Sequence, residues 1–284
     1  MIRLDGSTVL LQWATGGLLF CWVTTRRREV GLGYGWLLRS VFGLMAIGAA
    51  AVGSVAGHPS AVRDVAAVVV AVAAGVALVV SVVRRGAGVA GQREVTERRS
   101  ARVAAMTGID RAETVLVRSG REFPPGLDLI APIIGVVGLI AAANADGGPL
   151  PLAIVRTLVG AAFLGAVTDA MLLGHWYLVQ PGLGRQALLE QVRWLAIMWP
   201  AEVGSLLWPV GMVSVFTGRV NDGWGGTMGY FWAACAITTI VLCYVTRKAL
   251  DERAYSAVMA ATGLLYLAIL TAFGTDLVAR AVLA

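Results

Sequence analysis

The sequence has little charge and a single lysine. Only 14% of its 284 residues are charged and 58% are hydrophobic, against about 25% and 45 to 50% in soluble globular domains. Mean hydropathy is +0.76. A water-soluble fold of this length would not cover so much apolar surface, so this composition excludes that class and favours an integral membrane protein. We attribute the scarcity of lysine, Lys248 against 22 arginines, to compositional bias without mechanistic meaning.

The sequence also lacks the usual signatures of metal, disulfide and phosphate chemistry. Its three cysteines, Cys21, Cys235 and Cys243, lie inside apolar runs without CxxC spacing, so neither a disulfide framework nor a zinc site is expected. No GxxxxGK[ST] phosphate loop, HExxH zinc motif or GxSxG elbow is present. The sequence therefore shows no motif for catalysis on soluble metabolites. The hypothesis of an intramembrane enzyme that acts on a lipid stays open.

Apolar runs of membrane-spanning length fill most of the chain. A helix of about 20 apolar residues crosses a hydrocarbon core of about 30 Å, and only helices satisfy every backbone amide within one segment. Short turn-rich connections make neighbouring helices antiparallel. We therefore predict one all-α transmembrane domain over residues 1–284, a polytopic bundle of eight helices built from antiparallel hairpins, at about 8–24, 37–57, 64–83, 127–143, 154–179, 194–216, 228–246 and 256–279.

The arginines predict the topology of these spans. They gather in the connections after the first, third, fifth and seventh spans, whereas the other connections hold few basic residues. Arginine and lysine are retained on the cytoplasmic side, so we expect a multi-pass protein of the inner (cytoplasmic) membrane with both termini outside. The net charge of +6 is thus a topology signal. We expect the lipid bilayer as partner, other membrane subunits as candidate partners, and no nucleic acid.

Residues 86–126 form the one long connection, which we predict to be a charged cytoplasmic loop. Its core, Arg93 to Met106, alternates arginine with glutamate and can form an amphipathic helix on anionic headgroups. A solvated loop packed on the other cytoplasmic connections is the alternative.

The hairpin of spans 154–179 and 194–216 carries a carboxyl group well inside each of its two spans. Asp169 is about ten residues from the cytoplasmic end of span 154–179, and Glu202 is about eight residues into span 194–216 from the same side. At 1.5 Å per residue the two depths agree within one helical turn. Because buried ionisable groups in a bilayer are costly, they are functional candidates. We expect Asp169 and Glu202 to face each other, point into the bundle and share a proton as the catalytic pair.

A cofactor site is predicted beside this pair. His175 is the one histidine within an apolar span, and Trp176 and Tyr177 follow it. Trp199 shares a helix face with Glu202, next to the backbone carbonyls that Pro200 and Pro209 leave without donors. We assign His175, Trp176, Tyr177 and Trp199 to the binding of a quinone or a haem; no residue is assigned to a separate metal site. The structural alternative makes these aromatics interfacial anchors and the acids links within the bundle.

Three functions remain open at this point. The first is a membrane subunit of a proton-linked electron-transfer complex, with a quinone or haem at the helix pair 154–179 and 194–216. The second is a proton-coupled secondary transporter that uses the same carboxylates. The third is a non-catalytic scaffold or assembly subunit.

Overall fold

The computed structural model describes residues 4–55, 60–90, 121–145, 148–180, 183–209, 211–252 and 254–283. Within them all regular structure is helical, as predicted. The expected amphipathic helix at 93–106 lies outside the described residues. The elements are α1 (Gly6–Thr25), α2 (Leu32–Val55), α3 (Ala61–Val83), η1 (Arg84–Ala87), η2 (Pro125–Leu129), α5 (Ile130–Ala145), α6 (Leu150–Val179), α7 (Gln186–Leu207), α8 (Met212–Phe216), α9 (Thr227–Asp251) and α10 (Tyr255–Val282).

Seven of the described helices are long and apolar enough to cross a membrane, which are α1, α2, α3 with η1, η2 with α5, α6, α9 and α10. They suggest a multi-pass membrane protein. The eighth long helix, α7, has 22 residues and so is about 33 Å long at 1.5 Å per residue. It carries Glu190, Arg193 and Glu202 and is not among the seven.

The predicted span 194–216 is wrong in both boundaries. The helix begins eight residues earlier, at Gln186, and ends at Leu207. Its start was missed because Glu190 looks too polar for a span, but the Glu190 carboxylate accepts from Arg26 at 2.7 Å and from Arg27 at 2.6 Å. Its end is set by Pro209, because a proline disfavours the helical conformation of the residue before it. That residue, Trp208, accordingly has an extended backbone.

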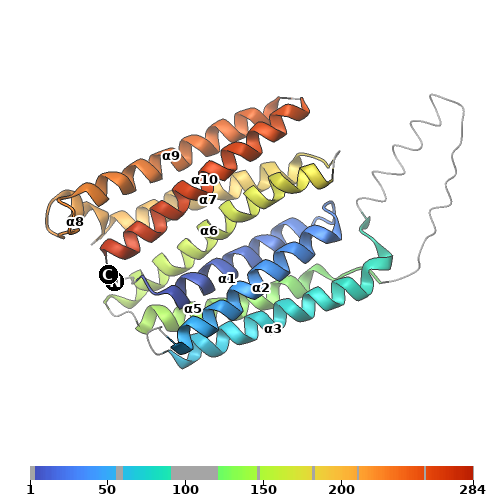
Figure 1. The fold of residues 1–284 in the computed structure, drawn as a ribbon, viewed down its shortest axis with the longest axis horizontal. Coiled ribbons are helices and arrows are strands. Elements are labelled where there is room, and N and C mark those ends of the chain that lie inside the picture. Colours follow the sequence, from blue (N-terminus) through green and yellow to red (C-terminus); the bar gives the residue numbers. More distant parts are fainter. Residues whose placement is uncertain are drawn as a thin grey trace, which may run out of the picture.

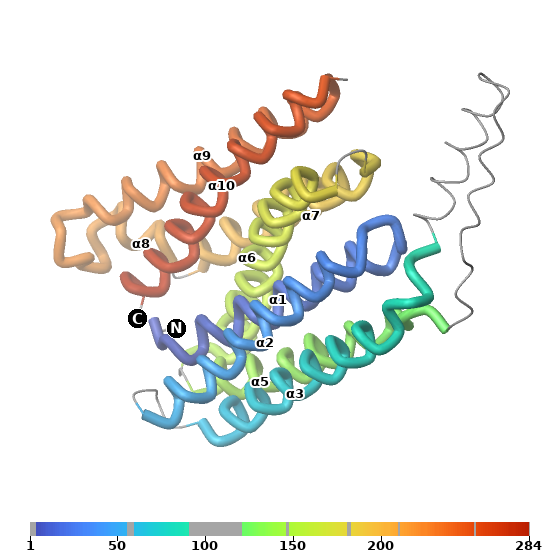
Figure 2. The backbone as a smooth tube through the Cα atoms, turned by 45° about the vertical axis from the view of Figure 1, so that its right-hand side comes forward, coloured from blue at the N-terminus to red at the C-terminus, as the bar shows by residue number. Residues whose placement is uncertain are grey.

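The long helices form two groups of four. In the first, α1, α2, α3 and α5 pack around one another, and in the second α6, α7, α9 and α10 do so. Helix α1 joins the groups by packing along α6 (Figures 1 and 2). Both chain termini lie at one end of the bundle (Figure 1), here called the terminal end. The opposite, arginine-rich end holds Arg26 to Arg28, Arg84, Arg85 and Arg185.

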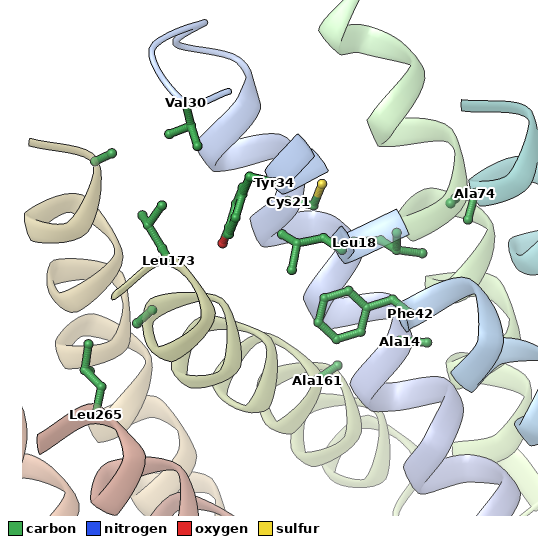
Figure 3. Close-up of a cluster of buried hydrophobic side chains, with 14 of the residues drawn as sticks. Ala14, Leu18, Cys21, Val30, Tyr34, Phe42, Ala74, Ala161, Leu173 and Leu265 are labelled. Atoms are coloured by element: carbon green, nitrogen blue, oxygen red, sulfur yellow. The ribbon is translucent and has the colours of Figure 1, made fainter. Parts of the chain in front are cut away.

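The contact between α1 and α6 is made backbone to backbone. A Cβ at Gly16 would overlap the carbonyl oxygen of Ala161, and a Cβ at Gly165 would overlap the backbone of Gly16. Small residues allow this approach, which is a common way to pack helices in a bilayer. Beside it, Phe42 of α2 fills the space left by Gly17, and the same apolar cluster continues to Leu173 and Leu265 (Figure 3).

Buried arginines connect the helices of the first group. At the arginine-rich end, Arg39 of α2 donates to both carboxylate oxygens of Asp128, each at 2.7 Å, and its guanidinium lies over the Phe123 ring. At the terminal end, Arg63 of α3 pairs with Asp5, the N-cap of α1, at 2.5 Å. Both arginine side chains are only 2% exposed.

Candidate functional site: a buried charged cluster on α1, α6, α7 and α10

Five polar side chains meet where α1, α6, α7 and α10 pack together, in the half of the bundle toward the terminal end. They are Gln12, Arg156, Glu202, Asp276 and Arg280, and none is more than 1% exposed. We call them the charged cluster. Four of them are ionisable, two of each sign, in the interior of apolar helices. Buried ionisable groups on apolar helices are costly, so such a concentration of charge is a candidate functional site.

Asp276 lies at the centre of the hydrogen bonds in this cluster. Arg280, one turn later on α10, donates its Nε hydrogen to Oδ2 of Asp276 at 2.8 Å. Gln12 of α1 donates to Oδ1 at 3.4 Å. Gly160 of α6 leaves the room for this arrangement, because a Cβ there would overlap the Gln12 amide and lie 2.7 Å from Oδ1 of Asp276. The absence of a side chain at Gly160 therefore lets three helices share one polar site.

Arg156 connects α6 to the broken end of α7. Its Nε hydrogen is donated to the carbonyl oxygen of Ser205 at 2.8 Å. In a continuous helix that oxygen would accept from the N–H four residues later, but Pro209 has none. The sequence predicted that the prolines would leave carbonyls in need of partners, and for Pro209 the partner is an arginine of the neighbouring helix.

Glu202 is the acid of the cluster whose oxygens accept nothing. Among the described residues neither carboxyl oxygen makes a hydrogen bond. Its electrostatic neighbours are Asp276, Arg280 and Arg156. Two ionised carboxylates are both acceptors, so Glu202 and Asp276 could hydrogen-bond to each other only when one of them carries a proton.

Asp169 is fully buried, as expected, but it does not meet Glu202. It lies ten residues before the end of α6 at Val179, about 15 Å at 1.5 Å per residue. Glu202 lies 16 residues after the start of α7 at Gln186, about 24 Å. The expected match in depth rested on a helix start at 194, so the earlier start removes it. The predicted pairing of Asp169 with Glu202 is therefore wrong, and Asp276 occupies the place expected for Asp169.

The three consecutive aromatic residues near the end of α6 face different neighbours. His175 is exposed on the surface of the bundle, where its Nδ1 lies 3.4 Å from the Tyr266 hydroxyl of α10. Trp176 packs against Tyr34 of α2, with ring centroids 5.9 Å apart. Tyr177 is buried and donates its hydroxyl hydrogen to the Gly184 carbonyl at 2.6 Å. A helix turns about 100° per residue, so these side chains do not line one site.

The fourth predicted cofactor residue is separate again. Trp199 donates its indole hydrogen to the Ala236 carbonyl of α9 at 2.8 Å. A bis-histidine haem needs two histidines on facing helices, and His175, with Tyr266 beside it, is the one histidine among the described residues. The described residues therefore hold no bis-histidine pair. A quinone needs only hydrogen-bond donors near lipid, which the exposed His175 and Tyr266 offer.

Four members of the charged cluster were not predicted from the sequence: Gln12, Arg156, Asp276 and Arg280. A signal for two of them was present, since Asp276 and Arg280 stand four residues apart and so share a helix face. They lie at the far end of the last apolar run, where charges are ordinarily taken as flanking. Arg156 was missed for the same reason, because it lies near the start of its span.

Comparisons with protein families, curated proteins and solved structures find no match to this chain.

Proposed function

We propose that this chain moves protons across a membrane as a proton-coupled secondary transporter, with Glu202 as the residue that binds the proton. The observation that carries the proposal is the position of Glu202. It is a fully buried acid that accepts no hydrogen bond among the described residues, beside a second acid, Asp276, and two arginines.

The net charge of the charged cluster depends on whether Glu202 carries a proton. With every group ionised, Arg156 and Arg280 balance Glu202 and Asp276, so the net charge is zero. A proton on Glu202 leaves one net positive charge in the interior, where an unbalanced charge is expensive. The two protonation states therefore favour different surroundings for the cluster. That is the requirement for coupling proton binding to a rearrangement of α7 and α10.

The break after Leu207 supports the same function. Transporters place their sites at discontinuous helices, where freed backbone groups and buried charges meet. Here the break lies within one turn of Ser205, whose carbonyl Arg156 occupies. A scaffold subunit has no need of this arrangement, because well-packed apolar residues are as stable as a buried ion pair or more so.

A quinone-linked electron-transfer subunit is the second candidate. One observation favours it: the imidazole of His175 is exposed beside the Tyr266 hydroxyl on the outer surface of α6 and α10, where a lipophilic carbonyl compound would arrive from the bilayer. Quinone co-purification with the wild-type protein, lost in His175→Ala, supports this candidate over the transporter.

Proton flux through purified protein tests the primary proposal. The protein is reconstituted into liposomes that contain a pH-sensitive dye, and a potassium diffusion potential drives proton entry. We expect flux above that of empty liposomes, and its loss in Glu202→Gln, which keeps the shape but not the titration. Glu190→Gln on the same helix is the matched control and keeps the flux. Equal flux in both variants, or none in the wild type, contradicts the proposal.

The location follows from the same proposal. We place the chain in the cytoplasmic membrane with both termini outside, because the arginine-rich end is the one retained in the cytoplasm. The charged cluster then lies in the outer half of the bilayer.

A further inference from the structure

We propose that Asp169 is a second protonation site, joined to the arginine-rich end by Tyr34, Thr24 and Gln191. This inference rests on the proposed function, because it supplies the site from which protons reach the other side of the membrane. It concerns a different residue from Glu202 and a different half of the bundle.

Asp169 has the burial and the lack of partners that such a site needs. Its side chain is 0% exposed, and among the described residues neither carboxyl oxygen has a hydrogen-bond donor. Buried polar groups without partners are rare and call for an explanation. A protonated carboxyl group avoids the cost of burying a charge. If Asp169 also releases and rebinds its proton, the lack of a fixed hydrogen-bond donor beside it is explained.

A line of buried polar groups leads away from Asp169. Tyr34 of α2 donates its hydroxyl hydrogen to the Asp169 carbonyl oxygen at 3.1 Å, and Figure 3 shows its ring between α1 and α6 with the hydroxyl toward α6. Thr24 of α1 is an electrostatic neighbour of the same hydroxyl. Gln191 of α7 donates to the Thr24 hydroxyl at 2.6 Å. Thr24 is one residue from the end of α1, so the line ends at the arginine-rich end.

Asp169 and Glu202 have different electrostatic neighbours. Tyr34 of α2 and the buried thiol of Cys21 on α1 interact with Asp169, and Cys21 in turn interacts with Arg39 and Asp128. Glu202 interacts directly with Arg156 and Arg280.

The closest contact of α1 with α6 separates the two acids. Asp169 lies nine residues from Gly160, which packs against the charged cluster, about 14 Å along the α6 axis. Between them Gly165 packs directly on the backbone of Gly16, so α1 and α6 touch there with no side chain between them. Trp13, whose indole donates to the Thr168 hydroxyl at 2.9 Å, adds bulk on the same side. The fold thus holds one acid toward each end of the bundle with a closed contact between them.

Infrared spectroscopy on protein in lipid nanodiscs tests this inference without any transport assay. Aspartate carboxyls labelled with carbon-13 separate their bands from those of glutamate. We expect a protonated carboxyl band in acid-minus-alkaline spectra that is lost in Asp169→Asn and retained in Glu202→Gln. Asp169→Glu, which moves the band to the unlabelled position, gives the answer if the asparagine variant does not fold. A protonated carboxyl band that is the same in the wild type, in Asp169→Asn and in Asp169→Glu overturns the inference.

Hydrogen exchange of the same band tests the route. On transfer to D2O we expect the band to shift more slowly in Tyr34→Phe and Gln191→Leu than in the wild type. Tyr255→Phe is the matched control, because Tyr255 also donates to an α6 carbonyl, that of Tyr177 at 3.2 Å, but lies off the line. Exchange at the wild-type rate in Tyr34→Phe and Gln191→Leu refutes the route. Absent proton flux would overturn only the transport function, whereas an unchanged band would overturn only the second site.

Discussion

Arg156 on α6 donates to the carbonyl oxygen of Ser205 on α7, 2.8 Å away, at the position where Pro209 removes the helical donor. An arginine that also neighbours Glu202 therefore closes the backbone gap in the broken helix. The protonation of Glu202 and the end of α7 are connected through one side chain.

This relationship predicts a non-additive pair of substitutions. Arg156→Gln should destabilise the protein by about 3 to 5 kcal/mol, the usual cost of removing one partner of a buried charged group. In a Pro209→Ala background the loss should be smaller by about 0.5 to 3 kcal/mol, because a backbone N–H becomes available to Ser205. Thermal unfolding in detergent of the four proteins of the cycle measures this coupling. Strict additivity would mean that Arg156 does not serve this carbonyl.

The glycine contact between α1 and α6 predicts a sharp positional effect. Gly16→Ala and Gly165→Ala should each destabilise the protein by about 1 to 3 kcal/mol or more, since the added methyl meets backbone that cannot move aside. Gly75→Ala on α3 is the control. Its Cβ meets nothing within 4 Å, and a helical alanine is about 0.5 to 1 kcal/mol better than glycine. Melting temperatures that fall equally in all three would refute this packing.

The Arg39–Asp128 pair should matter far more than an exposed pair. Asp128→Asn leaves a buried guanidinium without its counter-charge and should cost about 3 to 5 kcal/mol. Asp251→Asn, whose partner Lys248 is 3.8 Å away and 61% exposed, should cost at most about 1 kcal/mol. Chemical unfolding in mixed micelles compares the two, and similar losses would contradict the difference in burial.

We predict that the stability of the turn before α9 depends on pH through the carboxyl group of Asp222. Its carboxylate accepts from the N–H groups of Gly226, Trp224 and Met228, and the first two in particular lower the pKa of Asp222. A carboxyl group whose pKa is lower in the folded state stabilises the fold at pH values above its unfolded-state pKa. That stabilisation is lost as the pH falls through its folded-state pKa.

Hydrogen exchange measures the effect at the amides of residues 223–230. Protection there should decrease in acid and should be lost at neutral pH in Asp222→Ala. Asp251→Ala should leave it unchanged. Protection that is independent of both pH and Asp222 would show that the turn is held by other contacts.

The helical class and most spans were predictable, because length and hydropathy alone define an apolar helix. The failure came at α7, where Glu190 is paired with Arg26 and Arg27 from a distant loop. A pairing across 164 positions leaves no mark in local composition. The helix start was therefore placed too late, and the depth of Glu202 with it.

The site was predictable only in part for the same reason. A carboxyl group inside an apolar run is visible in the sequence, so Asp169 and Glu202 were found. Their partners depend on which helices pack together, and the packing of α10 against α6 brings Asp276 rather than Asp169 to Glu202. Likewise His175, Trp176 and Tyr177 are adjacent in sequence but face three different neighbours.

The most direct test of the central claim is to observe the proton on Glu202. Protein with carbon-13-labelled glutamate carboxyls is placed in lipid nanodiscs, and infrared spectra are recorded during a pH titration. The account predicts a protonated glutamate band that is lost in Glu202→Gln, shifts in Asp276→Asn because the Asp276 carboxyl is an electrostatic neighbour of Glu202, and is unchanged in Glu190→Gln. A Glu202 that stays ionised throughout the titration would contradict the account.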